Sequence, residues 1–398
     1  MNGGADTDYL FGQGGNDLYK GGPDPDTAGF NSSPSPVHVD LGAGTATGEG
    51  TDTLVNINGI FGSSGDDILI GNDETNFIFG NAGNDNIQGL GNIDLVTPGA
   101  GDDTVDGGET DGSGFDLDIV YFTDAPGPVT VNLQTETATG DGSDTITNFE
   151  SVYGSDNDDD ITGDNDSNIL FGGLGNDTMD GGGGQATDYA AYWFAAAPVN
   201  ANLDTKSATG EGNDTLNGFE GLLGTIQFDD TLTGDNKDNY LDGDLGNDTL
   251  NGLGGDDLFL GGGGDDNMVG GAGSFDMADY FCVCDLNANL GTGSITGDGN
   301  DTVSGIEAVG AADGDDVLIG DDNANSLFGW GGNDLIQGMG GNDELDGGAH
   351  TNDIDGGAGT DLCANATTNV ACEEFPTLID DHPLRSASEL VSNFRRSF

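Results

Sequence analysis

The sequence predicts an all-β chain in which short strands stack as successive coils of a parallel solenoid. Three observations predict this fold. Between Gly310 and Ala364 an Asp or Asn recurs every nine residues, an apolar residue stands two positions after each, and a glycine-rich turn precedes each. The three residues between turns suffice for a short strand with one inward side chain, but not for a capped helix. Two units make a coil of eighteen residues, so turns eighteen residues apart lie above one another.

The turn has the composition of a site for a hard cation. It is most complete at residues 356–361, which read GGAGTD, and the repeating unit is GGxGxDxUx, where U is apolar. Glycine permits tight or positive-φ backbone in which carbonyl oxygens converge, and the Asp at position 6 adds an anionic oxygen. This oxygen set suits calcium, and we expect one ion between two turns on the same edge of the stack.

The predicted metal ligands are the Asp residues at position 6 of the repeat. They are Asp8, Asp17, Asp67, Asp85, Asp94, Asp103, Asp159, Asp177, Asp230, Asp248, Asp257, Asp266, Asp316, Asp334, Asp343 and Asp361. The second unit of each regular run instead has Asn at this position (Asn76, Asn168, Asn239 and Asn325). Asn keeps an oxygen and loses the charge, so either a weaker site or a neutral hydrogen-bonding cap is expected there.

The composition implies a chain that needs cations to fold. Its 398 residues include 75 Gly, 73 acidic residues and 6 Lys or Arg, with a formal net charge of -67. Without bound cations such a chain cannot bury enough apolar surface to offset ordering and self-repulsion. The charge also argues against nucleic acid and anionic membrane surfaces as partners. No apolar run has the length of a transmembrane segment, and the N-terminus does not resemble a signal peptide, so we expect export to use another route.

The chain divides into six parts. Residues 1–30 form a partial block that opens inside a repeat, so we expect a fragment of a longer protein or a late-starting gene model. Four super-repeats follow at 45–110, 116–187, 188–275 and 276–375, and residues 376–398 form a C-terminal tail.

Each super-repeat contains a GxGxDT turn in phase with the nonapeptides. Asp52, Asp144, Asp214 and Asp301 take position 6 in these turns. A half-coil follows, with Ile60, Val152, Leu222 and Ala308 expected to point inward. Glu150, Glu220 and Glu307 recur in it, either as extra ligands or as solvated edge charges.

Segments with a DxxxY or DxxxF signal connect the runs, at residues 118–122, 188–192 and 276–280. Each precedes a segment of alternating apolar residues, which we expect to form irregular coils that continue the solenoid. The aromatic residues Tyr121, Tyr192, Trp193 and Tyr280 either form a carbohydrate-stacking surface or pack over an enlarged coil.

Two features near the C-terminus have alternative interpretations. Cys282 and Cys284 lie in one CxC motif, whereas Cys363 and Cys372 either close a small loop as a disulfide or leave Cys363 as a buried free thiol. In the tail, Ala387, Leu390, Val391 and Phe394 have the spacing of a short amphipathic helix, and Arg385, Arg395 and Arg396 are half of the basic residues. The tail is expected to cap the last coil or to act as a secretion signal.

The nonapeptides, the GxGxDT turns and the alternating strands together resemble the RTX, or haemolysin-type, calcium-binding repeat family over nearly all of residues 1–375. The resemblance implies a parallel β-roll with calcium between its turns, and type I secretion through an uncleaved C-terminal signal. Relatives often carry a catalytic domain. This sequence has no HExxH, GxSxG or EF-hand pattern, so we do not expect an enzyme.

The predicted function is that of a secreted calcium-binding repeat protein that folds on meeting calcium outside the cell and serves as a structural or binding module. One alternative is the C-terminal calcium-binding domain of a larger secreted enzyme of the metalloprotease, lipase or alginate epimerase type. Another is an adhesin stalk. The sequence does not identify a protein or glycan partner.

Overall fold

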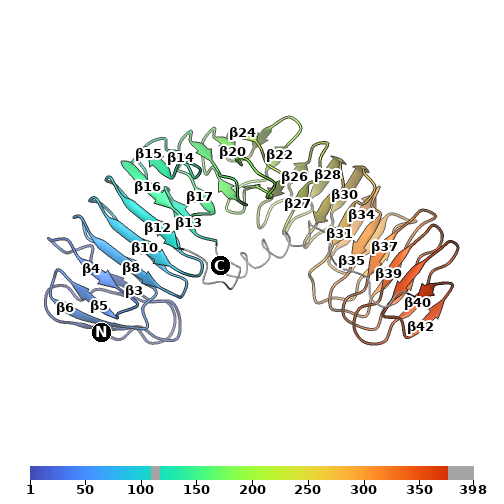
Figure 1. Cartoon of the computed structure of the whole chain (residues 1–398), viewed down its shortest axis with the longest axis horizontal. Helices are drawn as coiled ribbons and strands as arrows, with labels where there is room; N and C mark the ends of the chain where they lie inside the picture. The colour runs from blue at the N-terminus through green and yellow to red at the C-terminus, as the bar shows by residue number, and fades with distance from the viewer. Residues whose placement is uncertain (109–116, 375–398) are drawn as a thin grey trace. The chain divides into compact units, whose positions relative to one another are not determined.

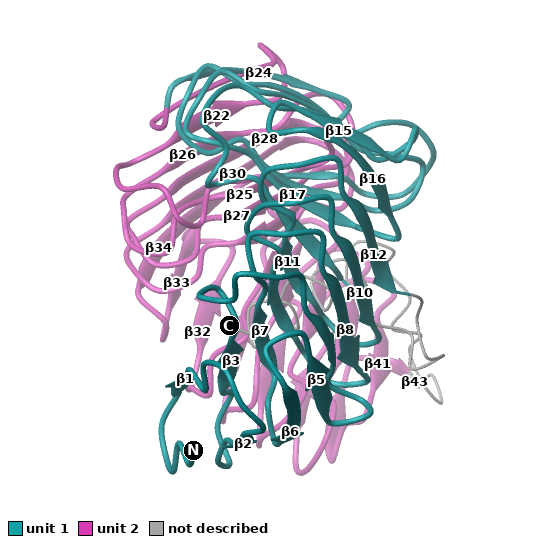
Figure 2. Ribbon diagram, turned by 90° about the vertical axis from the view of Figure 1, so that its left-hand side faces the viewer, with its two compact units in different colours: residues 1–190, 212–218, 390–398 teal, residues 191–211, 219–389 magenta. Residues whose placement is uncertain are grey.

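The computed structural model describes residues 1–108 and 117–374, which contain strands and no helix. Contacts divide this part of the chain into two compact units (Figure 2). Unit 1 contains residues 1–190 and 212–218, and unit 2 contains residues 191–211 and the described residues from 219 onward. Each unit is a β-roll of two sheets, so the predicted all-β solenoid is confirmed. The expected C-terminal helix falls outside the described residues.

Each coil is built from turns whose backbone only certain residues adopt readily. In the turn before Asp85, Asn81 has a φ of 74° and Gly83 a φ of 121°. Glycine, and Asn to a lesser degree, tolerate this left-handed region because a Cβ there meets the neighbouring carbonyl. The strand after the turn, β10 (Asn86–Leu90), exposes Asn86 and buries Ile87.

The sheet that we call sheet A is parallel throughout. In unit 1 its strands stack in the order β1 (Tyr9–Leu10), β3 (Thr27–Gly29), β7 (Gly59–Phe61), β9 (Phe77–Phe79), β11 (Leu95–Thr97), β13 (Ile119–Tyr121), β17 (Ser151–Tyr153), β19 (Ile169–Phe171) and β21 (Tyr189–Ala191). In unit 2 the order is β25 (Gly221–Leu223), β27 (Tyr240–Asp242), β29 (Leu258–Leu260), β31 (Met277–Asp279), β35 (Ala308–Gly310), β37 (Ser326–Phe328), β39 (Glu344–Asp346), β41 (Leu362–Ala364) and β43 (Glu373–Glu374).

Sheet B is the opposite wall of each coil and mixes parallel and antiparallel pairs. In unit 1 its order is β2 (Leu18–Lys20), β6 (Thr51–Val55), β5 (Thr45–Thr47), β4 (His38–Asp40), β8 (Ile68–Asn72), β10, β12 (Thr104–Gly108), β16 (Ser143–Thr147), β15 (Thr137–Thr139), β14 (Thr130–Asn132), β18 (Asp160–Thr162), β20 (Thr178–Asp180) and β24 (Asn213–Asn217).

In unit 2 the order of sheet B is β23 (Ser207–Thr209), β22 (Asn200–Asn202), β26 (Thr231–Thr233), β28 (Thr249–Gly254), β30 (Asn267–Ala272), β34 (Asn300–Ser304), β33 (Ser294–Thr296), β32 (Asn287–Asn289), β36 (Val317–Ile319), β38 (Leu335–Gln337), β40 (Asp353–Asp355) and β42 (Thr368–Val370). Figure 1 shows consecutive strands of one sheet, such as β8, β10 and β12, lying side by side.

The strand register follows the eighteen-residue coil. Ile87 in β10 pairs with Leu69 in β8 on one side and with Val105 in β12 on the other. These three side chains are fully buried, and so are their counterparts in the other runs, among them Ile78, Val96, Ile161, Leu170, Met179, Leu232, Leu241, Leu250, Phe259, Met268, Leu318, Leu327, Ile336, Leu345 and Ile354. The predicted inward position is therefore confirmed in every regular run. In the last half-coil, however, the inward residue is Val309 and not Ala308, because Val309 pairs with inward Leu327.

The segments between the runs differ from the expected irregular coils. They fold back as antiparallel strands within sheet B, as in β14–β15–β16, where Val131 pairs with Ala138 and Ala138 with Asp144. The first strand of each hairpin then continues the stack in parallel, as β14 does on β18. Alternating apolar residues specify a strand and its faces but not its direction, which is why the sequence did not predict the reversal.

The aromatic residues that were candidates for carbohydrate stacking are mostly buried. Tyr192, Trp193 and Tyr280 are each less than 5% exposed, and the Tyr280 hydroxyl donates to Asp301 Oδ2 at 2.8 Å. Tyr121 lies on the outer side of sheet A, where its ring stacks on Tyr153 with centroids 5.5 Å apart. Packing is therefore the correct interpretation for the three buried rings. Among the described residues there is also no helix that could cross a membrane.

Candidate metal-binding turns

Hydrogen bonds join the turns of successive coils through the side chain at position 6. The backbone N–H of Asp67 donates to Asp85 Oδ1, and the N–H of Asp85 donates to Asp103 Oδ1, both at 2.7 Å. The same bond recurs from Asp159 to Asp177, from Asp230 to Asp248 and Asp266, from Asp316 to Asp334, and from Asn325 to Asp343 and Asp361, at 2.7 to 3.1 Å. The turns therefore face one another, with each carboxylate directed at the preceding coil.

We call the turns that lead into sheet A the A edge and those that lead into sheet B the B edge. Of the predicted ligands, Asp8, Asp94, Asp257, Asp343 and Asp361 lie on the A edge. The B edge holds Asp17, Asp67, Asp85, Asp103, Asp159, Asp177, Asp230, Asp248, Asp266, Asp316 and Asp334. Apart from Asp8 and Asp17, which are half-buried, all are less than 4% exposed.

The second carboxylate oxygen of many of these residues is buried without a hydrogen bond. This holds for Oδ2 of Asp8, Asp85, Asp103, Asp177, Asp248, Asp257, Asp266, Asp316, Asp334, Asp343 and Asp361. A buried anionic oxygen without a donor is costly, because it has lost its hydration and gained nothing in return. A cation at each turn would remove that cost.

Glycine at position 1 leaves room for a second oxygen beside Oδ2. A Cβ at Gly80 would overlap both Asp85 Oδ2 and the carbonyl oxygen of Pro98, which is position 1 of the next coil. The same two oxygen types would meet a Cβ at Gly252 and at Gly338. At these three turns, therefore, only a residue without a side chain allows a carboxylate oxygen of one turn and a carbonyl oxygen of the next turn to converge.

This oxygen set fits calcium, which binds carboxylate and backbone carbonyl oxygens in flexible geometry. The Asp at position 6 would supply the charge and the stacked turns would supply the carbonyls. Among residues 1–108 and 117–374, no three His, Cys, Asp or Glu side chains form a metal-binding cluster. A cation at these turns would therefore depend on main-chain oxygens, and side chains alone would not hold it.

Burial also changes the acidity of these carboxyls. It raises the pKa of Asp248 to about 8 and that of Asp85, Asp103 and Asp316 to about 7, against the ordinary Asp value. Neighbouring carboxylates raise these pKa values further, whereas the backbone N–H bond to each Asp lowers them. Desolvation is the largest cause, so in the absence of metal these turns favour the protonated form.

The Asn turns have a different arrangement, which decides between the two predicted alternatives. The side-chain oxygen of Asn325 accepts the N–H of Asp321 within its own turn at 2.8 Å, and its amide lies 3.5 Å from the carbonyl oxygen of Glu307. Asn76, Asn168 and Asn239 close their own turns in the same way at 2.6 to 2.7 Å. Asn at position 6 thus forms a neutral hydrogen-bonded cap.

Three of the predicted Asp ligands are closed in a similar way. Ser63 donates its N–H to Asp67 Oδ2 at 2.5 Å and its hydroxyl to Asp67 Oδ1 at 2.7 Å. Ser155 makes both bonds to Asp159, and the Thr225 N–H bonds Asp230 Oδ2 at 2.6 Å. Protein donors therefore occupy both oxygens of these carboxylates, which separates them from the other predicted ligands. The Ser or Thr four or five residues earlier is a sequence signal for this closure.

The recurring Glu residues end the hydrogen-bonded series on the A edge. Glu150 Oε2 accepts the N–H of Asp118 at 2.8 Å, and Glu307 Oε2 accepts the N–H of Asp276 at 3.1 Å. Each Glu takes the place that an Asp carboxylate holds elsewhere. In Glu150 and Glu307 the side chain therefore joins successive coils as a hydrogen-bond acceptor, in addition to the two roles expected from the sequence.

Several acidic residues outside the predicted ligand set belong to the same series. Asp26, Asp52, Asp118, Asp144, Asp188, Asp214, Asp276 and Asp301 each accept the backbone N–H of the position-6 residue in the preceding coil. In Asp52 and Asp144, Oδ2 is also buried without a hydrogen bond. The DxxxY and DxxxF motifs could have predicted that their Asp residues belong to this series. As in the nonapeptide unit, the residue two places after each Asp is apolar and inward (Val120, Ala190 and Ala278).

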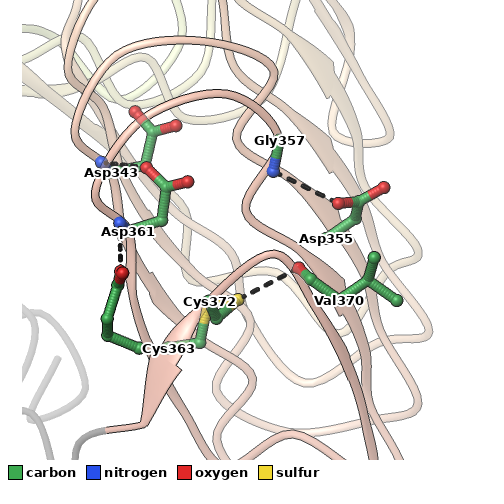
Figure 3. The surroundings of a disulfide bond; sticks show 8 residues. Asp343, Asp355, Gly357, Asp361, Cys363, Val370 and Cys372 are labelled. Atoms are coloured by element: carbon green, nitrogen blue, oxygen red, sulfur yellow. Dashed lines mark hydrogen bonds between the residues drawn. A yellow bond between two sulfur atoms is a disulfide. The ribbon is translucent and has the colours of Figure 1, made fainter.

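The last coil of unit 2 is closed by a disulfide between Cys363 and Cys372 (Figure 3). Cys363 occupies the inward position of β41 and is 3% exposed. Glu373 Oε2 accepts the N–H of Asp361 at 2.9 Å, as Glu150 and Glu307 do in earlier coils. Cys282 and Cys284 form a second disulfide. All four cysteines are therefore bonded, and the alternative of a free thiol at Cys363 is wrong.

A protein-family model described as RTX calcium-binding nonapeptide repeat (4 copies) matches residues 1–28, 61–96, 79–112, 153–187, 227–259, 242–274, 311–343 and 331–363. Together these stretches cover more than half of the chain and contain all sixteen predicted ligands. The antiparallel hairpins lie between them. No curated protein matches the chain.

Proposed function

Because the chain belongs to the family of RTX calcium-binding nonapeptide-repeat proteins, we propose that it is a secreted module whose folding depends on calcium and whose role is structural or binding, not catalytic. The observation that carries this proposal is the row of buried Asp Oδ2 atoms without donors. At Asp85, Asp257 and Asp343 a carbonyl oxygen of the next turn lies beside this oxygen. We propose that these oxygens hold calcium between stacked turns.

The charge of the chain supports calcium-dependent folding. The formal net charge is -67, and the position-6 carboxylates stack coil over coil along the turns. Bound calcium supplies positive charge at these turns, so the free energy of binding becomes free energy of folding. The chain itself contributes the oriented carboxylates and the glycine turns that allow close approach.

The expected affinity supports folding after export. Calcium sites of extracellular modules bind at about 10⁻⁴ to 10⁻³ M, far above cytosolic calcium levels. A chain of this kind would stay loose in the cytosol and fold outside the cell. The family resemblance also favours secretion.

The first test is to measure the calcium dependence of folding. Circular dichroism of the full chain in EDTA is expected to show a disordered chain, and millimolar calcium is expected to restore the β signal. Asp334→Asn keeps the Oδ1 acceptor that the Asp316 N–H uses and removes the charge. This variant should raise the calcium concentration at the folding midpoint several-fold.

The matched control is Asp322→Asn in the same super-repeat, because Asp322 is exposed and lies outside the hydrogen-bonded series. Its calcium midpoint should equal that of the unmodified chain. A β signal that is the same in EDTA and in calcium would overturn the proposal. An equal shift in both variants would show that net charge, and not the turn geometry, sets the midpoint.

A further inference from the structure

The first carboxylate of each regular run faces a connecting loop and not a nonapeptide turn. These four residues are Asp67, Asp159, Asp230 and Asp316. Each accepts at Oδ1 the N–H of the last loop residue, at 2.7 to 2.8 Å. The donors, in the same order, are Val37, Val129, Val199 and Leu286. What the loop offers therefore decides whether a cation can lie at these places.

Super-repeat 4 leaves this carboxylate open, whereas the other three super-repeats close it. Ser or Thr residues donate their N–H to Oδ2 of Asp67, Asp159 and Asp230. The residue four places before Asp316 is Ala312, which lacks the hydroxyl. Asp316 Oδ2 is buried without a hydrogen bond. Of the four carboxylates, that of Asp316 is thus the one with an oxygen left for a cation.

The loop that faces Asp316 has the main-chain arrangement of a nonapeptide turn. It comprises residues 281–286, between β31 and β32, and we call it the CxC loop. A Cβ at Gly314 would lie 2.1 Å from the carbonyl oxygen of Cys284. In the next pair of turns, a Cβ at Gly332 would lie 1.6 Å from the carbonyl oxygen of Gly314. Cys284 therefore takes the place of the position-4 glycine of a preceding turn.

Asp285 takes the place of the position-5 residue of such a turn. Its Oδ1 accepts the N–H of Asp315 at 3.0 Å, as Asp315 Oδ1 accepts the N–H of Asn333 at 2.8 Å in the next coil. In the other three super-repeats a proline stands at this place (Pro36, Pro128 and Pro198). A proline ring has no acceptor. Of the four connecting loops, only the CxC loop can therefore bond the next turn through the side chain at position 5.

The CxC loop also offers oxygen where the next turn does not. Position 1 of the Asp316 turn is Ala311. Its Cβ occupies the space in which, at Gly80, a carbonyl oxygen of the next coil approaches Asp85 Oδ2. A cation at Asp316 would therefore take main-chain oxygens from the CxC loop, among them the Cys284 carbonyl.

The Cys282–Cys284 disulfide restricts this loop. Val283, between the two cysteines, is 90% exposed, so apolar packing does not hold the middle of the loop. Proline fixes φ in the other connecting loops. In the CxC loop the cross-link instead removes conformations that an open loop would populate. The disulfide therefore limits how far the Cys284 carbonyl can turn away from Gly314.

We propose that the CxC loop and the Asp316 turn hold a cation between them, in a site of which one side lies outside the nonapeptide repeats that the family model matches. This inference rests on the proposed function, since it takes calcium as the ion of the stacked turns. Asp316 supplies the carboxylate, and the loop supplies main-chain oxygens. The disulfide is a positioning group, because it lowers the entropy cost of ordering the loop around the ion. Super-repeat 4 then carries a cation at the start of its run, where the other three carry a closed turn.

Native mass spectrometry of the full chain tests this site by counting bound calcium ions. The Ser63 hydroxyl donates to Asp67 Oδ1 and accepts the N–H at position 4 of its turn, and Ser155 does the same for Asp159. Ala312→Ser should close the Asp316 turn in this way, so the variant should bind one ion fewer than the unmodified chain in saturating calcium.

The matched control is Ala324→Ser, because Ala324 is exposed and precedes the closed turn of Asn325. The control should keep the ion count of the unmodified chain. An unchanged count in Ala312→Ser, or an equal loss in both variants, would overturn the inference and leave the proposed function standing. A full chain that binds no calcium would overturn both.

Hydrogen exchange of residues 311–319 during a calcium titration tests the part played by the disulfide. Cys282→Ser with Cys284→Ser should raise the calcium concentration at half protection several-fold, whereas Cys372→Ser, which opens the other disulfide, should not. In the Ala312→Ser background the loss of the Cys282–Cys284 disulfide should cause no further shift, since the site is already closed. An equal shift in both backgrounds would show that the disulfide only stiffens the loop and would overturn its role at the site.

Discussion

At the residue scale, the difference between Asp and Asn at position 6 is the ability to donate a hydrogen bond. Asn325 accepts from its own turn through Oδ1 and directs its amide at the Glu307 carbonyl. Asp343, one coil later, accepts from the Asn325 N–H and leaves Oδ2 without a donor. The first residue therefore satisfies its turn with protein groups, and the second leaves an anionic oxygen for a cation.

Asn325→Asp tests this distinction. The new carboxylate cannot donate to the Glu307 carbonyl and would lie beside it, so we expect a lower thermal midpoint in saturating calcium, equivalent to about 1–3 kcal/mol. The measurement is thermal unfolding followed by circular dichroism.

The matched control is Asn342→Asp, one position before the ligand position of its own turn. Asn342 Oδ1 accepts the N–H of Thr360 at 3.0 Å. Asp315, at the same position of an earlier turn, accepts the corresponding N–H of the next coil at 2.8 Å, so a carboxylate serves equally well there. The control should therefore keep the midpoint of the unmodified chain, and equal midpoints for the two variants would refute the capping role.

At the element scale, the last coil shows how the stack ends. β42 pairs with β40 through residues fifteen apart, Asp353 with Thr368, and not eighteen apart as in the regular coils. The Cys363–Cys372 disulfide joins the inward position of β41 to the segment before β43. The shortened coil has fewer residues to fill its interior, so the covalent bond holds it closed where apolar packing is thin.

Loss of this disulfide should loosen the last coil selectively. Closing a loop of about ten residues stabilises by about 2–3 kcal/mol in the chain-entropy model. In calcium, Cys372→Ser should therefore speed amide hydrogen exchange in β41–β43 and leave β36–β39 unchanged, as measured by mass spectrometry. Cys284→Ser is the control and should leave the exchange of β41–β43 unaltered. Uniform acceleration along unit 2 would show that the coils open together and not one by one.

At the scale of the whole molecule, protons would compete with the proposed calcium ions for the same carboxylates. Burial raises the pKa of Asp85, Asp248 and Asp316 to about 7, 8 and 7, whereas in the unfolded chain these carboxyls titrate near 4. Without calcium the folded state thus binds more protons than the unfolded state. The stability of the calcium-free folded state is therefore highest at pH values below the carboxyl pKa of the unfolded chain. It is lost as the pH rises through the pKa values of these carboxyls in the folded state.

The pH dependence should therefore differ with and without calcium. In EDTA, the β signal in circular dichroism should be larger at about pH 5 than at about pH 8. In calcium, the signal should persist at the higher pH, and binding near neutral pH should release protons, which calorimetry in buffers of different ionisation enthalpy detects. A signal in EDTA that does not change over this pH range would contradict the raised pKa values.

The sequence by itself determined the period of the coil, the inward residues and the chemistry of the turns. Each of these depends on residues within one nine-residue unit, where glycine conformation, strand length and side-chain direction are local properties. This is why Ile87, Leu250 and Ile336 were placed correctly in the core, and why the position-6 Asp residues could be proposed as ligands from the repeat alone.

Only the tertiary structure decided which turns are closed by protein donors, which strands run antiparallel and how the cysteines pair. Asp67 and Asp85 occupy the same repeat position, yet a serine closes the first and the second leaves Oδ2 bare. Contacts between coils, from eighteen to about forty residues apart, control these features. A nine-residue pattern does not determine these features. It specifies the residues of one turn and not the residues of the adjoining coil that contact them.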